Sequence, residues 1–195
     1  MQRLRPILIG LPLVLAGCSS VGFSWSSLSP FNWFRSEVTV TDRGVGGINA
    51  ATPLTEDALD KALSGDYRFR KGMETANGGI VSFYQALKDK EVEMTIYGAD
   101  SGGVSRVVVE DKSVPSAWGV KIGTVFSDLY DKAFGACRKG VGEDSEAVVC
   151  AAPQSRHVDY VFIGEWQGPE SLMPADDVLR HWRVGKIIWH ADTVH

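Results

Sequence analysis

Two segments of the chain place apolar residues at the spacing of one helix face. In residues 54–64 this face consists of Ala58, Leu59, Ala62 and Leu63. In residues 124–134 it consists of Phe126, Leu129, Tyr130, Ala133 and Phe134. We therefore expect a helix at each segment, with Phe126, Leu129 and Phe134 nearly inaccessible to solvent.

Strand-like segments follow each of these helices, and several of them alternate apolar with polar residues, which is typical of a half-buried strand. After the first helix they are residues 67–71, 80–87, 92–97 and 104–109. After the second they are residues 136–138, 146–150, 158–163 and 184–189, with a short helix expected near Asp176 before the last of them. Runs of strands after a helix favour an α+β fold. We predict an antiparallel sheet with two helices on one side.

Part of the pattern occurs twice. Residues 57–63 align with residues 128–134, and each copy precedes a set of strands. This indicates a duplicated helix-plus-strands unit, with copies at about residues 52–110 and 120–190. The match is only seven residues long, so chance similarity is the alternative interpretation.

The first 17 residues have the pattern of a signal peptide. Arg3 and Arg5 precede an apolar run from Ile7 to Ala16, and residues 15–18 read Leu-Ala-Gly-Cys, as in a lipobox. The run has about half of the roughly 20 residues that a membrane-spanning helix needs. We predict cleavage before Cys18, lipidation of Cys18 and a periplasmic location, with Ser19 favouring the outer membrane. An ordinary secretory signal with a cysteine at the junction is the alternative.

Residues 18–36 form a distinct segment, in which seven serines give the composition of a flexible tether. Trp25, Phe31, Trp33 and Phe34 interrupt it. These aromatic residues either sit at the membrane interface or pack onto the folded domain, which we place at residues 37–195.

Charge and cysteine content agree with this location. Cleavage removes two arginines and changes the net charge from −4 to about −6, so there is no basic field for nucleic acid. Cys137 and Cys150 are the remaining cysteines, an even pair in an oxidising compartment. We expect a disulfide that ties the end of the second helix to the neighbouring strand, with Cα atoms about 4.4–6.8 Å apart. A catalytic or metal-binding cysteine is the alternative, although neither has a C-x-x-C partner or a nearby histidine.

The chain carries no recognisable catalytic, nucleotide-binding or metal-binding motif, so we predict no cofactor and no metal. His157 and Asp159 would share one strand face, either as a functional pair or as a surface contact. Arg68 and Arg70 flank Phe69 and either recognise an anionic partner or form a solvated strand face.

The loop at residues 164–174 is the most unusual segment. It holds Glu165, Trp166 and Glu170, and two carboxylates beside an indole could contact a sugar such as a peptidoglycan strand. Alternatively, Trp166 fills the core and the carboxylates face water. We treat these three residues as candidates for partner binding, with Trp166 as the anchor.

Three blocks of sequence resemble a known family. They are residues 65–73, residues 119–135 and residues 164–174 with 186–189. Together with the lipobox and Asn32-Trp33-Phe34, these blocks resemble the YfeY-like family of RpoE-regulated outer-membrane lipoproteins of enteric bacteria. The resemblance implies a periplasm-facing lipoprotein under envelope-stress control and matches the cysteine pair. It brings no known activity, and the tail at residues 190–195 is longer than the family's usual end, which leaves any role of His190 in doubt.

Three functions remain in consideration. The first is a non-enzymatic binding or maintenance module at the outer membrane, whose partner is a periplasmic protein or glycan. The second is a proteinaceous inhibitor of a periplasmic or foreign hydrolase, which rests on fold analogy and would be favoured by a concave sheet face with exposed aromatic residues. The third is a peptidoglycan-acting enzyme, which requires a deep pocket lined by Glu165, Glu170 and a histidine.

Overall fold

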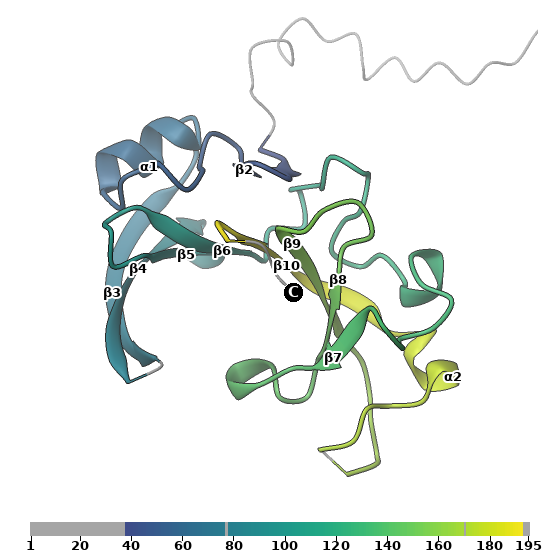
Figure 1. Cartoon of the computed structure of the whole chain (residues 1–195). Helices are drawn as coiled ribbons and strands as arrows, with labels where there is room; N and C mark the ends of the chain where they lie inside the picture. Colours follow the sequence, from purple (N-terminus) through teal and green to yellow (C-terminus); the bar gives the residue numbers. More distant parts are fainter. Residues whose placement is uncertain (1–37, 77, 170, 193–195) are drawn as a thin grey trace, which may run out of the picture. The chain divides into compact units, whose positions relative to one another are not determined.

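The computed structural model describes residues 38–192 apart from residues 77 and 170. Its main element is an eight-stranded sheet in which every neighbouring pair is antiparallel, in the order β3-β4-β5-β6-β10-β9-β8-β7 (Figure 1). The strands are β3 (Arg68–Ala76), β4 (Gly79–Lys88), β5 (Glu91–Gly98), β6 (Val104–Val109), β7 (Cys137–Lys139), β8 (Val148–Ala151), β9 (Val158–Ile163) and β10 (Arg183–His190). Two α-helices, α1 (Glu56–Ala62) and α2 (Asp176–Leu179), accompany the sheet. The predicted α+β class is therefore confirmed. The expected tether and the predicted lipidation site lie outside the described residues.

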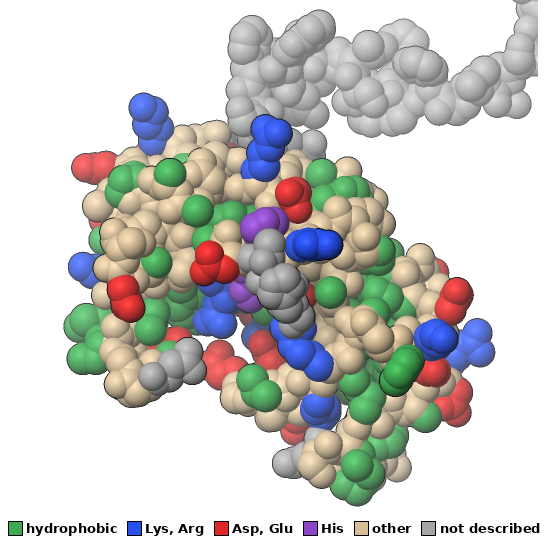
Figure 2. Space-filling view, in the orientation of Figure 1, with side chains coloured by type: hydrophobic (Ala, Val, Ile, Leu, Met, Phe, Trp, Pro, Cys, Tyr) green, Lys and Arg blue, Asp and Glu red, His purple; other side chains and the backbone are tan. Residues whose placement is uncertain are grey.

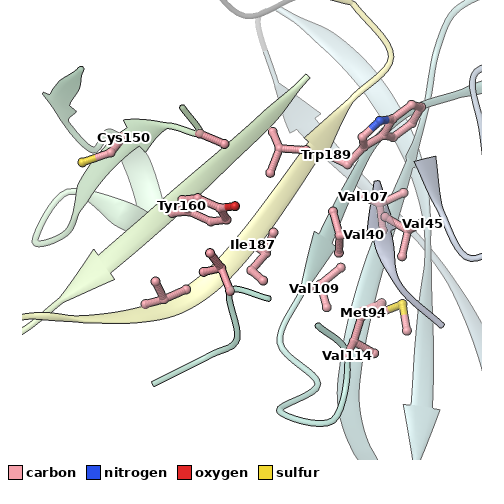
Figure 3. Packing of buried hydrophobic residues seen from close by; sticks show 14 of the residues in the cluster. Val40, Val45, Met94, Val107, Val109, Val114, Cys150, Tyr160, Ile187 and Trp189 are labelled. Atoms are coloured by element: carbon pink, nitrogen blue, oxygen red, sulfur yellow. The ribbon is translucent and has the colours of Figure 1, made fainter. Parts of the chain in front are cut away.

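One face of the sheet carries the main hydrophobic core. Buried residues of β5, β6, β9 and β10 point into it, among them Met94, Val107, Tyr160 and Trp189. A small hairpin, β1 (Val40–Thr41) and β2 (Gly44–Val45), covers part of this face, and Figure 3 shows Val40 and Val45 beside Val107 and Val109. The segment between β6 and β7 covers more of it through residues such as Val114 and Phe126.

Helix α1 forms where the pattern predicts it. Its first turn carries Glu56 and Asp57 and its last turn Lys61, charges that suit the two ends of the helix dipole. The turn that follows the helix contains a glycine in the left-handed region: Gly65 has φ +74°, and its N–H donates to the Asp60 carbonyl at 3.0 Å. Leu59 and Leu63 are fully buried in the main core.

The prediction of a second helix at residues 124–134 is wrong. Only a single turn of 3-10 helix, η3 (Phe126–Asp128), forms there. The backbone makes tertiary hydrogen bonds instead: Val184 N–H donates to the Thr124 carbonyl at 2.9 Å, and Ala133 N–H donates to Asp176 Oδ1 at 2.8 Å. In a helix over this segment, both groups would be bonded to a residue four positions away in the segment itself.

The burial expected along this segment is accordingly only partly right. Phe126 is 1% exposed, but Leu129 is half-buried and Phe134 is 87% exposed. The two α-helices that do form both reach the main core, α1 through Leu59 and Leu63 and α2 through Leu179.

The strand order relates the two halves of the chain. Strands β3–β6 and β7–β10 occupy the two halves of the sheet in opposite order, so that β6 and β10 pair at the centre. A duplicated unit would give this arrangement. Because an α-helix precedes only the first set of strands, the duplication itself stays a prediction.

Candidate functional site

The two cysteines that follow Cys18 in the sequence form the predicted disulfide. Cys137 and Cys150 are direct cross-strand neighbours in β7 and β8, with their sulfur atoms 2.06 Å apart. Their Cα atoms are 4.0 Å apart, closer than the expected range, because they face each other across paired strands. The bond therefore joins two strands at the sheet edge, and the expected link to a helix end is wrong.

Trp166 matches each of the two alternatives, partner binding and filling of the core, in part. Its ring packs partly against the main core, and its Nε1–H donates to the Pro169 carbonyl at 3.0 Å. A side chain on Gly168 would collide with the indole, whose Cζ2 would lie 2.1 Å from the added Cβ, so the loop folds closely around this ring.

Trp166 also lines an open cleft of about 530 Å³, together with Glu165, Lys139, Glu146 and Gln167. Glu165 is exposed, and Glu170 lies outside the described residues. Among the lining residues that the structure describes there is no histidine, which the peptidoglycan-enzyme hypothesis requires. The cleft therefore offers an indole edge and mixed charges to a partner.

The pairing of His157 with Asp159, which the sequence left open as one alternative, is not formed. His157 Nδ1 lies 3.0 Å from the His190 carbonyl oxygen instead. Asp159 is fully buried on the sheet face opposite the main core, where its Oδ2 accepts a hydrogen bond from Arg138 at 2.7 Å and lies 3.6 Å from His190 Nε2. Its Oδ1 has no partner among the described residues.

Electrostatics keep Asp159 ionised despite its burial. Burial alone would raise the pKa of this carboxyl, but the polar contact with His190 at 3.6 Å, the hydrogen bond from Arg138 and the charges of both groups outweigh it and hold the pKa below its usual range. This cluster brings His190 into contact with a buried acid, a neighbour that the sequence did not suggest.

Arg68 and Arg70 lie on the exposed edge strand β3. Arg70 donates to Gln85 Oε1 through Nε at 2.9 Å and through Nη2 at 2.6 Å, while Phe69 packs against the main core. The Arg70 guanidinium is therefore hydrogen-bonded to a side chain of the neighbouring strand β4.

The sheet face opposite the main core, which we call the open face, carries an aromatic and cationic row. Phe83, Tyr97, Arg106 and His190 are successive cross-strand neighbours on β4, β5, β6 and β10. The Phe83 and Tyr97 ring centroids are 5.7 Å apart, and the Arg106 guanidinium carbon lies 4.1 Å from the Tyr97 centroid. All four side chains are partly exposed.

Charged groups from both sides border this row. Figure 2 shows a hollow between the β3–β4 hairpin and the turn η4 (Gly142–Asp144), with Lys and Arg, Asp and Glu, and His side chains around it. Near the turn, Lys186 donates to Asp144 at 2.9 Å and lies 3.9 Å from Glu110. Burial alone would lower the pKa of Lys186, but these carboxylates raise it above its ordinary value.

The sequence analysis missed this row. The alternation of β5 could have put Tyr97 on the polar face of its strand, whereas β6 has valines on both faces and gives no such signal for Arg106. It could not have shown that they are neighbours, because the pairing register is set by the whole sheet. Among the described residues, no group of three or more His, Cys, Asp or Glu side chains is arranged to hold a metal ion.

The fold and the open face define an α+β protein built on one antiparallel sheet, in which one face carries the main core and the other carries a small apolar cluster beside a hollow bordered by aromatic and charged side chains. The chain belongs to the family described as "Protein of unknown function (DUF1131)", whose model matches residues 22–191. It is 52% identical over 190 residues to the uncharacterized protein YfeY of Escherichia coli strain K12, covering 97% of this chain and 99% of that protein. It is also similar to the crystal structure of yfeY from Escherichia coli, with a TM-score of 0.72 and 51% identity over 78% of this chain and 99% of that one. The resemblance to YfeY-like proteins is thus confirmed, and these relatives assign no activity.

Proposed function

We propose that this protein is a lipid-anchored periplasmic lipoprotein of the outer membrane, acting as a non-enzymatic binding or maintenance module in the envelope-stress response. The anchor rests on the lipobox that ends at Cys18. The binding role rests on one observation above the others: the open face leaves a row of aromatic and cationic side chains facing a hollow instead of a second packed layer.

The anchor is tested by Cys18→Ser, with Ser19→Ala as a matched control that leaves the lipobox cysteine in place. We expect the first variant to lose its acyl chains, as measured by the mass of the N-terminal peptide, and to leave the outer-membrane fraction. The control should remain acylated and membrane-bound. A Cys18→Ser variant with unchanged mass and unchanged fractionation would contradict the proposal. Among the described residues, no helix has the length and apolar character needed to span a bilayer.

The binding role is tested in intact cells by placing a photo-crosslinking amino acid at single positions. Tyr97 reports on the open face, Trp166 on the cleft in the 164–174 loop, and Phe134 serves as the control because it is 87% exposed outside both. We expect discrete crosslinked products from position 97 or 166 and none from position 134. Products from position 134 alone, or from no position, would contradict a partner surface at these sites.

Inhibition of a hydrolase is the second candidate. It is favoured by the partly exposed aromatic residues at the hollow of the open face, the feature expected for this function, and by the β3–β4 hairpin, which carries Met73 at 70% and Ile80 at 75% exposure. Exposed apolar side chains on a hairpin could enter the active-site cleft of an enzyme. The test is the rate of peptidoglycan hydrolysis by a muramidase with increasing amounts of the full chain. A dose-dependent fall that Met73→Ser and Ile80→Ser abolish would support inhibition, and an unchanged rate would reject it for that enzyme class.

A further inference from the structure

The cations of the open face differ in their partners. Arg138 forms an ion pair with Asp159 at 2.7 Å and Lys186 with Asp144 at 2.9 Å, whereas Arg70 donates hydrogen bonds to the neutral amide of Gln85. Arg106 contacts the ring of Tyr97 instead. No described carboxylate lies within 4.0 Å of its guanidinium nitrogens, the distance that defines an ion pair. Arg106 is therefore a half-buried cation that contacts an aromatic ring and forms no ion pair with a described residue.

The contact with the Tyr97 ring does not neutralise Arg106, and no described carboxylate does so either. A guanidinium carries five N–H donors in a planar fork, and those that remain available match the two oxygens of a carboxylate or phosphate. The ring also fixes the orientation of the guanidinium, so less conformational entropy is lost when an anion binds. Phe83, 5.7 Å from Tyr97, extends the platform with an apolar surface.

Two acids border the same hollow from opposite sides. Glu74 lies on β3, and the strand alternation puts it on the face that carries Phe83 and Tyr97. Glu143 lies on the η4 turn. Both are near enough to Tyr97 to raise its pKa, after the larger effect of its burial, while Arg106 lowers it. Neither acid forms an ion pair with a described residue. The hollow thus combines Arg106, a cation that forms no ion pair with a described residue, with an acid on each side that also forms none.

This charge pattern selects the ligand. A simple anion would be attracted by Arg106 but repelled by Glu74 and Glu143, whereas a molecule that carries both charges would match all three. We propose that Arg106 binds a carboxylate of an amphoteric peptide whose ammonium group is held by Glu74 or Glu143, with Phe83 and Tyr97 contacting its apolar part. This inference rests on the proposed binding function and names the ligand class of the open face.

The test follows the Arg106 Nε–H signal in NMR spectra of the isotope-labelled full chain in detergent micelles. The probes are trialanine, its N-acetylated form, its C-terminal amide and inorganic phosphate. We expect a saturable shift with trialanine, a weaker response to the acetylated peptide and none with the amide. A stronger response to phosphate than to trialanine would overturn the assignment to peptides, and no response to any probe would overturn the site.

Variants separate the two charges. Arg106→Gln should weaken trialanine binding roughly tenfold or more, measured from the Tyr97 backbone signal, because charge-assisted hydrogen bonds are lost. Arg180→Gln removes the same charge from an exposed position at the end of α2 and should leave binding unchanged.

Glu74→Gln combined with Glu143→Gln keeps Arg106 and provides an independent test should the Arg106 variant not fold. In this double variant the preference for trialanine over its acetylated form should disappear, and retention of the preference would overturn the role of the acids. The proposed function and the peptide site fail differently. Crosslinks at position 97 in cells without probe binding reject the peptide site alone, whereas probe binding without crosslinks rejects the cellular binding role.

Discussion

Two phenylalanines eight residues apart provide a direct test of the core. The sequence pattern assigns Phe126 and Phe134 to the same buried helix face, but the structure leaves the first 1% and the second 87% exposed. Phe126 lies between two other rings, with centroid distances of 5.0 Å to Phe162 and 5.3 Å to Tyr130. We therefore compare Phe126→Ala with Phe134→Ala in the otherwise unchanged chain.

The expected costs differ severalfold. Truncating a buried phenylalanine typically costs about 3–5 kcal/mol, from lost burial and the cavity left behind. The contacts with two neighbouring rings, each worth roughly 0.5–1.5 kcal/mol beyond burial, favour the upper part of that range for Phe126. Phe134 has few contacts to lose, so its truncation should change the free energy of unfolding by no more than about 0.5 kcal/mol.

The assay is urea unfolding under oxidising conditions, followed by tryptophan fluorescence and far-UV circular dichroism. For Phe126→Ala we expect a lower midpoint at an unchanged slope and a melting temperature lower by roughly 6–20 °C. Equal losses in the two variants would refute the structure of this segment, because that result belongs to a continuous helix with both rings buried.

Three further predictions concern the disulfide, the buried acid and the loop cleft. Replacing Cys137 and Cys150 together by serine should cost about 3 kcal/mol of unfolding free energy relative to the oxidised chain, the estimate for a loop of this length, and equal urea midpoints would contradict it. The folded-state pKa of Asp159 lies below its unfolded value, so the contribution of this carboxylate to stability is present above about pH 4 and is lost as the pH falls through the folded pKa. The difference in unfolding free energy between wild type and Asp159→Asn should therefore shrink on acidification. A difference that grows would contradict the direction of this pKa shift. Trp166→Phe removes the donor to the Pro169 carbonyl and should lower the free energy of unfolding by about 1 kcal/mol. Trp166→Ala should also abolish crosslinks from a photo-crosslinking residue at position 167. Persistence of those crosslinks would exclude the indole as an anchor.

The strands show how far a local pattern can be interpreted. The segments 104–109 and 158–163 match β6 and β9 residue for residue, because short runs rich in β-branched and aromatic residues are a local signal for a strand. Helix α1 also follows from local signals, namely acidic residues at its start and Gly65 at its end. The segment 124–134 has an equally good helical pattern, yet β10 and α2 take up its backbone groups. Its apolar residues lie in two different environments, since Phe126 is buried and Phe134 is exposed, so the helical pattern alone was misleading.

The candidate sites divide in the same way. Residue types indicated the cysteine pair and marked the 164–174 loop as unusual, since both signals are contained in short stretches of sequence. The neighbours of Asp159 come from β7 and β10, and those of Arg106 from β5 and β10. Neither the group around Asp159 nor the group around Arg106 can be predicted from the spacing of residues along the chain.

The sequence by itself determined the α+β class, most strand positions, the first helix and the residues that form the disulfide, because each depends on composition or on the spacing of near neighbours. The tertiary structure decided the strand order, the loss of the second helix, the exposure of Phe134 and the row from Phe83 to His190 on the open face. These features depend on pairing register and on competition for backbone hydrogen bonds between segments far apart in the chain. A one-residue shift in the register of β6 would turn Arg106 into the core and Val107 toward the hollow, so the proposed site exists only because the whole sheet fixes that register.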